Sequence, residues 1–348
     1  MAETTLTPNT TAAPPAISFW QRFGFLLRPP FGPLLFLLII CAIFTALPLL
    51  RGQENRFLTL QNFSLIFQQT VVIGVLAIGQ TLIILTAGID LSNGLIMALS
   101  SVVMAGLAVK GFTLAPTGTP IDPYIAIGLG LLLAGAFGFL NGFLITRLRL
   151  PPFIVTLGML NIAFALTRMY TTTTINNLPA PLIALGQTFD FFGARITYST
   201  LVMLALFFIF WFILSQTQLG RHIYAVGDNA EAASLVGIPV KRILLIVYTV
   251  AGFLYGIAGL LLISRLQNGD PQAGQTSNLE SITAVVLGGT SLFGGRGHII
   301  GTLIGALIIS VIRNGLTQQG AQPIIQTFIT GILVIAAVAV DQLSQRQK

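Results

Sequence analysis

The strongest constraint in this sequence is a series of long apolar runs that contain few charged residues. A helix needs about 20 consecutive apolar residues to cross the hydrocarbon core of a bilayer, and most of the runs approach that length. They lack the alternation of apolar and polar residues that marks an outer-membrane barrel. We therefore expect an all-α polytopic membrane protein with about ten transmembrane helices. The expected spans cover residues 31–50, 63–87, 92–109, 124–146, 153–171, 199–215, 243–264, 280–294, 298–316 and 324–341, of which the glycine-rich run at 280–294 is the shortest.

Composition supports this interpretation and excludes two other classes of protein. Only 8% of the 348 residues are Asp, Glu, Lys or Arg, against about 25% in a typical soluble domain. The chain is therefore neither a typical soluble enzyme nor a disordered chain. The net charge of +7 does not indicate nucleic-acid binding, because the basic residues are scattered in ones and twos and form no stripe.

The basic residues in the loops predict the orientation of the chain in the membrane. Lys and Arg are enriched on the cytoplasmic side, and an N-terminus placed inside leaves more of them on that side than outside. An even number of spans then puts both termini in the cytoplasm. We expect a disordered cytoplasmic tail over 1–30, a transmembrane domain over 31–341 and a cytoplasmic tail over 342–348. The residues assigned to the inner side are Arg22, Arg28, Arg147, Arg149, Arg221, Lys241, Arg242, Arg296, Arg346 and Lys348.

The internal loop formed by residues 216–242 contains signals for a very short helix. Asp228 or Asn229 can cap its N-terminus, since either side-chain oxygen can accept hydrogen bonds from free backbone amides. With Asp228 as the cap, Glu231 would occupy the third helical position of a capping box. A glycine that can end the helix follows. These signals predict a helix of about two turns over 229–236.

A helix of two turns is not stable alone in water, so one of its faces must be buried. Ala230, Ala233 and Ser234 give it a flat face of small residues, and Leu235 and Val236 offer an apolar contact. One interpretation is that the helix docks onto a cytoplasmic partner. The other is an ordinary connecting helix that packs on its own bundle.

Four motifs in this chain resemble those of ABC importer permeases. Residues 231–237 read E-A-A-S-L-V-G, which resembles the E-A-A-x-x-x-G loop of that family. Residues 220–229 (G-R-H-I-Y-A-V-G-D-N), 88–94 (G-I-D-L-S-N-G) and 286–297 (V-L-G-G-T-S-L-F-G-G-R-G) are similar to segments of the ribose, xylose and galactose permeases. The second of these has Asn93 where valine is usual. The resemblance covers about residues 60 to 340.

The resemblance implies a set of partners and a docking site. The loop would be the coupling helix that docks onto a cytoplasmic ABC ATPase, and that partner would bind ATP and Mg²⁺. It also implies an extracytoplasmic sugar-binding protein, a second permease copy in a homodimer or a heterodimer, and a prokaryotic inner-membrane location. The residues that it assigns to ATPase coupling are Gly220, Arg221, Gly227, Asn229, Glu231, Ala232, Ala233 and Gly237.

Several polar residues fall inside or beside the apolar runs and are candidates for the translocation path. Neutral hydrogen-bonding groups suit an uncharged polyol such as a sugar, but the same groups also join helices to one another. Asp90 can either cap the following helix or line the path, because a carboxylate in lipid must be capped, paired or hydrated. The candidates are Gln80, Asp90, Asn93, Asn141 and Asn161.

Motifs for catalysis, metal binding and phosphate binding are missing from the sequence. The two histidines are isolated, and neither H-E-x-x-H, G-x-S-x-G nor G-x-x-x-x-G-K-[ST] occurs. We expect a transport subunit with no catalytic residues, no metal and no cofactor of its own. Two alternatives remain: a permease for another small polar solute such as an amino acid, and an ion-driven secondary transporter that would depend on Asp90.

Overall fold

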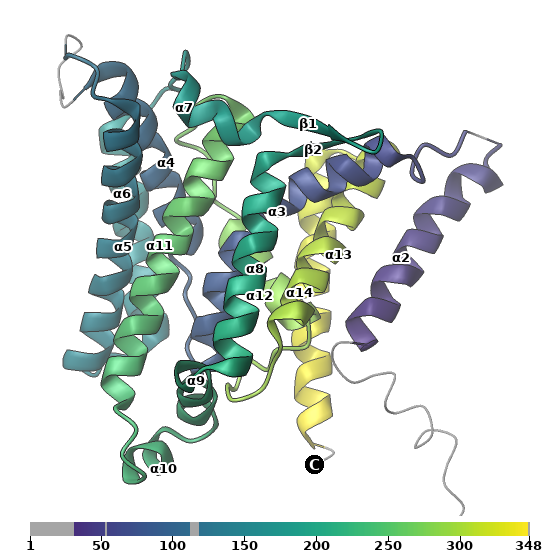
Figure 1. The fold of residues 1–348 in the computed structure, drawn as a ribbon. Coiled ribbons are helices and arrows are strands. Elements are labelled where there is room, and N and C mark those ends of the chain that lie inside the picture. The colour runs from purple at the N-terminus through teal and green to yellow at the C-terminus, as the bar shows by residue number, and fades with distance from the viewer. Residues whose placement is uncertain (1–30, 53, 112–117, 347–348) are drawn as a thin grey trace, which may run out of the picture.

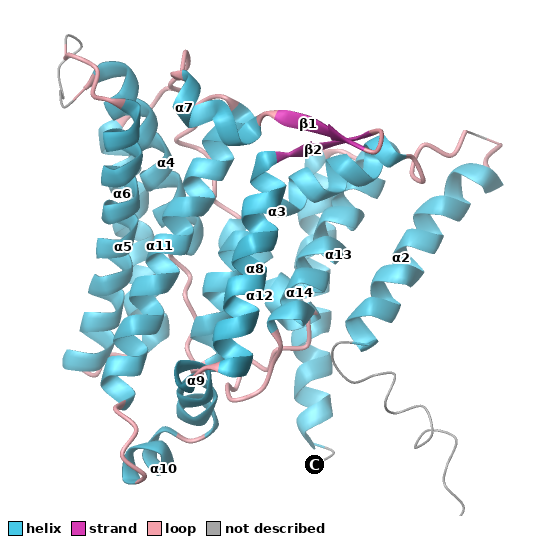
Figure 2. Ribbon diagram, viewed as in Figure 1, coloured by secondary structure: helices cyan, strands magenta, loops and turns pink. Residues whose placement is uncertain are grey.

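The computed structural model describes residues 31–52, 54–111 and 118–346, and helices dominate it (Figures 1 and 2). Among these residues, eight helices are long and apolar enough to cross a membrane, which confirms an all-α polytopic protein. The tail expected over 1–30 lies outside the described residues. The eight helices are α2 (Phe31–Leu50), α3 (Leu60–Leu85), α4 (Asn93–Lys110), α5 (Pro123–Arg147), α6 (Pro152–Tyr170), α8 (Tyr198–Gln216), α11 (Val240–Leu266) and α13 (Ile299–Gln318).

The last helix and several short elements complete the fold. The C-terminal helix α14 (Pro323–Arg346) has 24 residues, but its apolar part is the shorter stretch Pro323–Ala336. A two-stranded antiparallel hairpin pairs Thr188 with Thr197 and Phe191 with Ala194. The short elements are α7 (Ala180–Ile183), η2 (Ala184–Gly186), β1 (Thr188–Phe191), β2 (Ala194–Thr197), α9 (Gln218–Asp228), α10 (Ala230–Leu235) and α12 (Ser277–Leu287).

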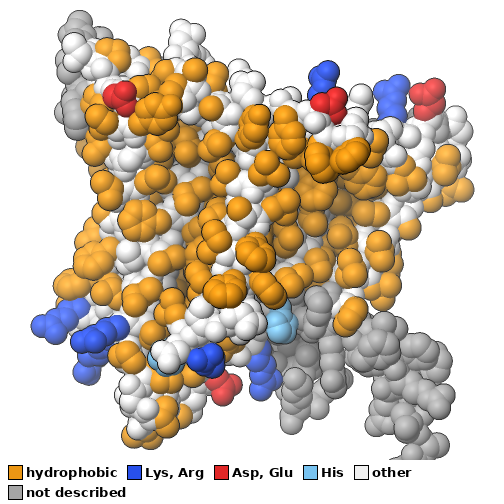
Figure 3. Space-filling model, viewed as in Figure 1, with side chains coloured by type: hydrophobic (Ala, Val, Ile, Leu, Met, Phe, Trp, Pro, Cys, Tyr) orange, Lys and Arg blue, Asp and Glu red, His pale blue; other side chains and the backbone are white. Residues whose placement is uncertain are grey.

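The long helices stand roughly side by side, so the molecule has two distinct ends (Figure 1). The hairpin lies across one end, and α9 and α10 lie at the other, where the described part of α14 also ends. Lys and Arg side chains gather at the end that carries α9 and α10 (Figure 3). By the enrichment of basic residues on the inner side, this is the cytoplasmic end, and the hairpin lies at the outer end.

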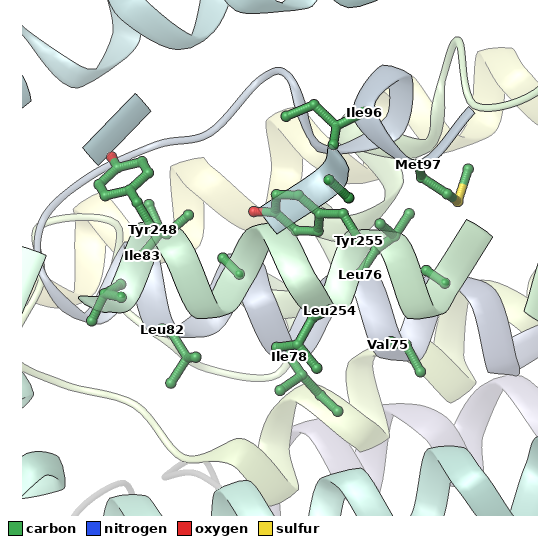
Figure 4. Packing of buried hydrophobic residues seen from close by; sticks show 14 of the residues in the cluster. Val75, Leu76, Ile78, Leu82, Ile83, Ile96, Met97, Tyr248, Leu254 and Tyr255 are labelled. Atoms are coloured by element: carbon green, nitrogen blue, oxygen red, sulfur yellow. The ribbon is translucent and has the colours of Figure 1, made fainter. Parts of the chain in front are cut away.

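The core forms around α11, which packs against α3, α4 and α5. Figure 4 shows Tyr248 and Tyr255 on one side of α11, among apolar side chains of α3 and α4. Helices α5 and α11 approach closely, since a Cβ atom on Gly252 would lie 2.9 Å from the Cα atom of Gly138. Glycine allows this approach, and close packing of this kind drives helix association in lipid.

Two pairs of helices, α3 with α4 and α11 with α12, are each joined by a non-helical segment, and we call each pair an interrupted unit. A helix of 26 residues, α3, is followed by non-helical residues 86–92 and then by α4. A helix of 27 residues, α11, is followed by residues 267–276, largely turns, and then by α12. The two units run in opposite directions, because α3 ends at the cytoplasmic end and α11 begins there. The starts of α4 and α12 meet, since Gly94 contacts the backbone of Gly274 and Asn278.

The expected span over 280–294 is wrong. Helix α12 has only 11 residues and ends at Leu287, and no helix continues it before α13. The reason is the glycine-rich sequence that follows. Gly289, Gly294 and Gly295 have φ angles of 84°, 86° and 67°, a left-handed conformation that ends a helix and that glycine adopts without steric cost.

Candidate functional site

The cytoplasmic loop forms two helices, α9 and α10, which the side chains of Thr217 and Asn229 cap. The hydroxyl oxygen of Thr217 accepts a hydrogen bond from the backbone N–H of Gly220 at 3.3 Å. The Oδ1 atom of Asn229 accepts one from the N–H of Ala232 at 2.9 Å. Each bond satisfies a backbone donor that a helix start leaves free. The helix expected over 229–236 is therefore confirmed to within a residue at each end.

The structure decides between the two caps that the sequence allowed. Asn229 is the cap of α10, and Asp228 is the last residue of α9. Glu231 is then the second helical residue, so the capping box that required Asp228 does not form. Gly237 ends the helix with a φ of 87°, and the next residue, Ile238, donates its backbone N–H to the carbonyl oxygen of Ala233 at 3.0 Å.

Helix α10 buries one side chain on its own protein and exposes the rest. Ala233 is only 4% exposed and belongs to the main hydrophobic core cluster. Leu235 and Val236, by contrast, are 89% and 77% exposed. The helix thus packs on its own bundle through Ala233, and its apolar end at Leu235 and Val236 is exposed at the cytoplasmic end. Docking of this end onto a partner stays a prediction.

The remaining loop residues that the resemblance singled out have two kinds of environment. Gly220 and Gly227 are buried, and a Cβ atom on either would overlap with a backbone carbonyl oxygen, that of Leu214 or of Leu85. Arg221, Glu231 and Ala232 are exposed. The glycines are needed for close backbone packing, and the exposed residues are free to face a partner.

Sequence reasoning missed helix α9. Its apolar residues Ile223 and Val226 are buried, and their spacing of three, with Thr217 as a cap before them, is a helix signal that was available. The hydroxyl of Tyr224 on the same helix donates a hydrogen bond to the carbonyl oxygen of Gly297 at 2.9 Å. Burial raises the pKa of Tyr224, so this phenol stays a neutral donor at physiological pH.

Four of the five path candidates meet in one buried network inside the membrane. Gln80, Asp90, Asn93 and Asn141 are each at most 1% exposed. The Nδ2 atom of Asn93 lies 3.0 Å from the Oε1 atom of Gln80 and donates to the Oγ atom of Ser281 at 2.8 Å. In the other orientation of its side-chain amide, Gln80 instead accepts from the backbone N–H and donates to the backbone C=O of Asp90. Gln80 therefore holds the interrupted segment to α3.

The carboxylate of Asp90 is satisfied by neutral donors. Its Oδ1 atom accepts hydrogen bonds from the backbone N–H of Ser92 at 2.7 Å and from the Ser92 hydroxyl at 2.5 Å. Its Oδ2 atom accepts one from the hydroxyl of Tyr255 on α11 at 3.2 Å. The carboxylate also lies at the N-terminal end of α4, where the helix dipole stabilises negative charge. Asp90 thus joins the interrupted segment, the start of α4 and α11.

The other interrupted unit contributes to the same network and carries a second buried acid. On α12, Asn278 donates from Nδ2 to the carbonyl oxygen of Leu91 at 3.1 Å. Glu280, two residues further on, is 3% exposed and pairs with Arg313 of α13. The bonds from Asn278 to Leu91 and from Asn93 to Ser281 join residues 187 and 188 positions apart, which one sequence cannot reveal.

Asn161 does not belong to this network. It lies on an exposed face of α6, and its Nδ2 atom donates to the carbonyl oxygen of Leu157 on its own helix at 3.0 Å. At Gly158, one turn earlier, no neighbouring helix among the described residues places an atom within 4 Å of the position of a Cβ. An exposed amide on a helix that crosses lipid is costly, because lipid offers it no hydrogen bonds. The face of α6 with Gly158 and Asn161 is therefore expected to lie against protein or a polar molecule and not against lipid.

Comparisons with known families and with individual proteins match this chain to permease components of transport systems. The family model described as "Branched-chain amino acid transport system / permease component" matches residues 62–338. The fructose import permease protein of Rhizobium meliloti is 43% identical over 295 residues, 83% of this chain and 79% of that protein. The ribose import permease protein of Bacillus subtilis is 40% identical over 317 residues, 89% of this chain and 92% of that protein.

A third relative, the D-allose transport system permease protein of Escherichia coli, is 37% identical over 332 residues, 93% of each chain. No solved structure gives a significant match. The family model covers most of the chain, including both interrupted segments and the cytoplasmic loop. Together with the apolar helices, these matches identify the chain as a multi-pass prokaryotic inner-membrane protein that belongs to the family of permease components of the branched-chain amino acid transport type.

Proposed function

We propose that this chain is the membrane-spanning permease of an ATP-driven importer and that it moves a monosaccharide into the cell. Its three named relatives are permeases for fructose, ribose and D-allose, which supports a sugar over an amino acid. The chain is a transport component that makes and breaks no covalent bond. A separate ATPase subunit binds ATP and Mg²⁺, and an extracytoplasmic binding protein delivers the sugar.

The exposed end of α10 carries the proposal. Leu235 and Val236 are apolar, more than three-quarters exposed and located at the cytoplasmic end of the molecule. The exposed Glu231 and Ala232 stand on the same helix. Burying an exposed leucine side chain contributes about 1.5–3 kcal/mol of favourable free energy. A partner protein that covers this end of α10 would therefore bind more tightly. The ATPase is the partner that this end fits.

Transport requires that the helices around the buried network rearrange. Non-helical backbone at membrane depth is tolerated where it is enclosed in protein or lines an aqueous path, and transporters place such breaks at their substrate pathway. The segments 86–92 and 267–276 are breaks of this kind. We infer that Gln80, Asp90, Asn93 and Asn141 hold the breaks together in the state seen here and become accessible as the path opens.

A second permease copy completes the path. The exposed face of α6 with Gly158 and Asn161 supports this, because small residues let two helices approach closely and a polar side chain needs a partner in lipid. A homodimer would bring two such faces together. Asn161 then meets either its own counterpart or the sugar that passes between the two copies.

The proposal is tested by the substitution Leu235→Asp in the purified permease. A charge at this exposed position leaves the permease folded but opposes burial of α10, so binding of the ATPase weakens by at least about tenfold. The matched control is Phe192→Asp, because Phe192 is 91% exposed at the opposite, outer end. Equal ATPase affinity for both variants would show that α10 is not the docking site.

An ion-driven secondary transporter makes a different prediction. It needs an ionisable group that releases its ion or proton during each cycle. Asp90, the residue on which that alternative would depend, is enclosed by Ser92 and Tyr255. Sugar uptake into cells that keep their ATP but have lost their proton gradient separates the two: the ATP-driven permease continues to transport, and an ion-driven one stops.

A further inference from the structure

A point of contact between three backbone segments lies between α10 and the interrupted part of the membrane domain. The first segment is the end of α9, at Gly227. The second is the end of α3, at Leu85 and the residues just after it. The third is the loop 288–298, which joins α12 to α13. We call this contact the glycine joint and define it by Gly227, Gly294 and Gly295.

The segments meet mainly backbone against backbone, with the Cβ atoms of Ala87 and Asp228 beside them. A Cβ atom on Gly227 would overlap with the carbonyl oxygen of Leu85 and would lie 2.6 Å from the backbone nitrogen of Gly295. That nitrogen donates a hydrogen bond to the same carbonyl oxygen at 3.0 Å. On Gly294, a Cβ atom would lie 2.7 Å from the carbonyl oxygen of Gly227 and 2.8 Å from the Cβ atom of Ala87.

One side-chain bond reinforces the joint. The hydroxyl of Tyr224, one turn before Gly227 on α9, donates to the carbonyl oxygen of Gly297 at 2.9 Å. Helix α9 is therefore fixed to the loop 288–298 at two places. Closely packed contacts of this kind do not compress, so they transmit a displacement from one segment to the next.

The joint contacts both interrupted units, at the end of α3 and at the loop that follows α12. Leu85 is the last residue of α3, and the segment that holds Asp90 begins directly after it. The loop 288–298 directly follows α12, which carries Asn278 and Ser281 into the same buried network. A displacement of α9 must therefore shift the segments that lead into α4 and out of α12 together, or separate the joint.

We propose that the glycine joint transmits the movement of α10 to α4 and α12, so that Gly227, Gly294 and Tyr224 are positioning residues for coupling and not for ATPase binding. This inference rests on the proposed function, since it takes α10 as the site that the ATPase moves. It assigns a role to the glycine-rich motif at 286–297, which contacts neither the exposed end of α10 nor the outer surface where sugar arrives.

The test uses the complete complex of permease, ATPase and sugar-binding protein in proteoliposomes. Tyr224→Phe removes one hydrogen bond without adding an atom, and Gly294→Ala adds a methyl group at a left-handed position against Ala87. The control is Gly128→Ala on α5, where a Cβ atom would have no neighbour within 4 Å. Three quantities are measured for each variant: ATPase affinity, ATP hydrolysis, and the number of sugar molecules transported per ATP.

We expect ATPase affinity and ATP hydrolysis to stay within about twofold of the control in both variants. Transport per ATP should fall about fivefold in Tyr224→Phe, as expected for one lost hydrogen bond, and at least tenfold in Gly294→Ala. The ratio is counted per functional complex, so a smaller yield of folded protein does not change it. If the Gly294→Ala variant does not fold, the transport ratio of the Tyr224→Phe variant alone tests the inference.

Two results would overturn the inference. One is a transport ratio equal to that of the control in Tyr224→Phe. The other is a loss of transport that only follows a loss of ATPase binding, which would make the joint part of the docking site. Failure of the proposed function is seen separately, because the unsubstituted permease would then bind no ATPase at all.

Discussion

At the scale of single residues, the sequence identifies the polar candidates for the translocation path inside the membrane. It does not identify the side chains to which they are hydrogen-bonded. Gln80, Asp90, Asn93 and Asn141 stand out in the sequence because polar groups are rare in apolar runs. Their partners Tyr255 and Ser281 do not, because tyrosine and serine occur in membrane helices without special meaning. The hydrogen bonds between them join α3, α4, α11 and α12, and only the folded chain brings these residues together.

The charge of Asp90 can be separated from its hydrogen bonds by substitution. Asp90→Asn keeps an acceptor for Ser92 and a polar group for the Tyr255 hydroxyl, so it should cost about 1 kcal/mol or less of unfolding free energy. Asp90→Ala leaves buried donors without a partner and should cost about 3 kcal/mol. Chemical or thermal unfolding of the purified permease measures both.

Transport by the Asp90→Asn variant completes this prediction. We expect it to keep at least about half of the ATP-driven uptake, because no step in the proposed mechanism requires a negative charge at this position. Complete loss of uptake with an unchanged unfolding free energy would instead show that the carboxylate takes part in each transport cycle, as an ion-driven mechanism requires.

At the scale of elements, most helices could be predicted because length and hydropathy identify them. The short helix over 229–236 was also predictable, from its capping residue and from Gly237. The motifs of the loop do not indicate helix α9. The spacing of Ile223 and Val226, which are both buried on it, does so. The end of α12 at Leu287 was missed because an apolar glycine-rich run has the composition of a span, while its left-handed glycines end the helix.

The contact between α5 and α11 gives a prediction for helix packing. In Gly138→Ala, the new methyl group would overlap with the carbonyl oxygen of Tyr248 and lie 2.8 Å from the Cα atom of Gly252. We expect a loss of about 1–3 kcal/mol of unfolding free energy. Gly128→Ala on the same helix should change it by less than about 0.5 kcal/mol. Similar losses in both variants, measured by denaturant unfolding, would contradict the close packing of these helices.

At the scale of the whole molecule, the sequence predicted the helical membrane fold and the end that carries the cytoplasmic loop. It did not predict that two interrupted units run in opposite directions and meet at the starts of α4 and α12. That arrangement depends on contacts between residues far apart in the chain. It places the buried network in the middle of the molecule and the glycine joint between that network and α10.

The proposed pairing of two permeases is tested through α6. In a Cys41→Ser background, which removes the single native cysteine, Gly158→Cys should form a disulfide between two copies in membranes after mild oxidation. Leu204→Cys on α8, an exposed residue of another helix, is the control. Cross-linked dimers are counted on non-reducing gels, and equal yields at the two positions would contradict a dimer contact on α6.

The central claim is that ATP hydrolysis on a partner subunit drives sugar through this chain. The most direct measurement is uptake of radiolabelled ribose, fructose and allose by proteoliposomes that contain the permease, its ATPase and its binding protein, with ATP supplied on the side of α10. We expect uptake of one of these sugars that requires ATP and the binding protein and persists with a protonophore. Uptake that needs no ATP and stops with the protonophore would contradict it.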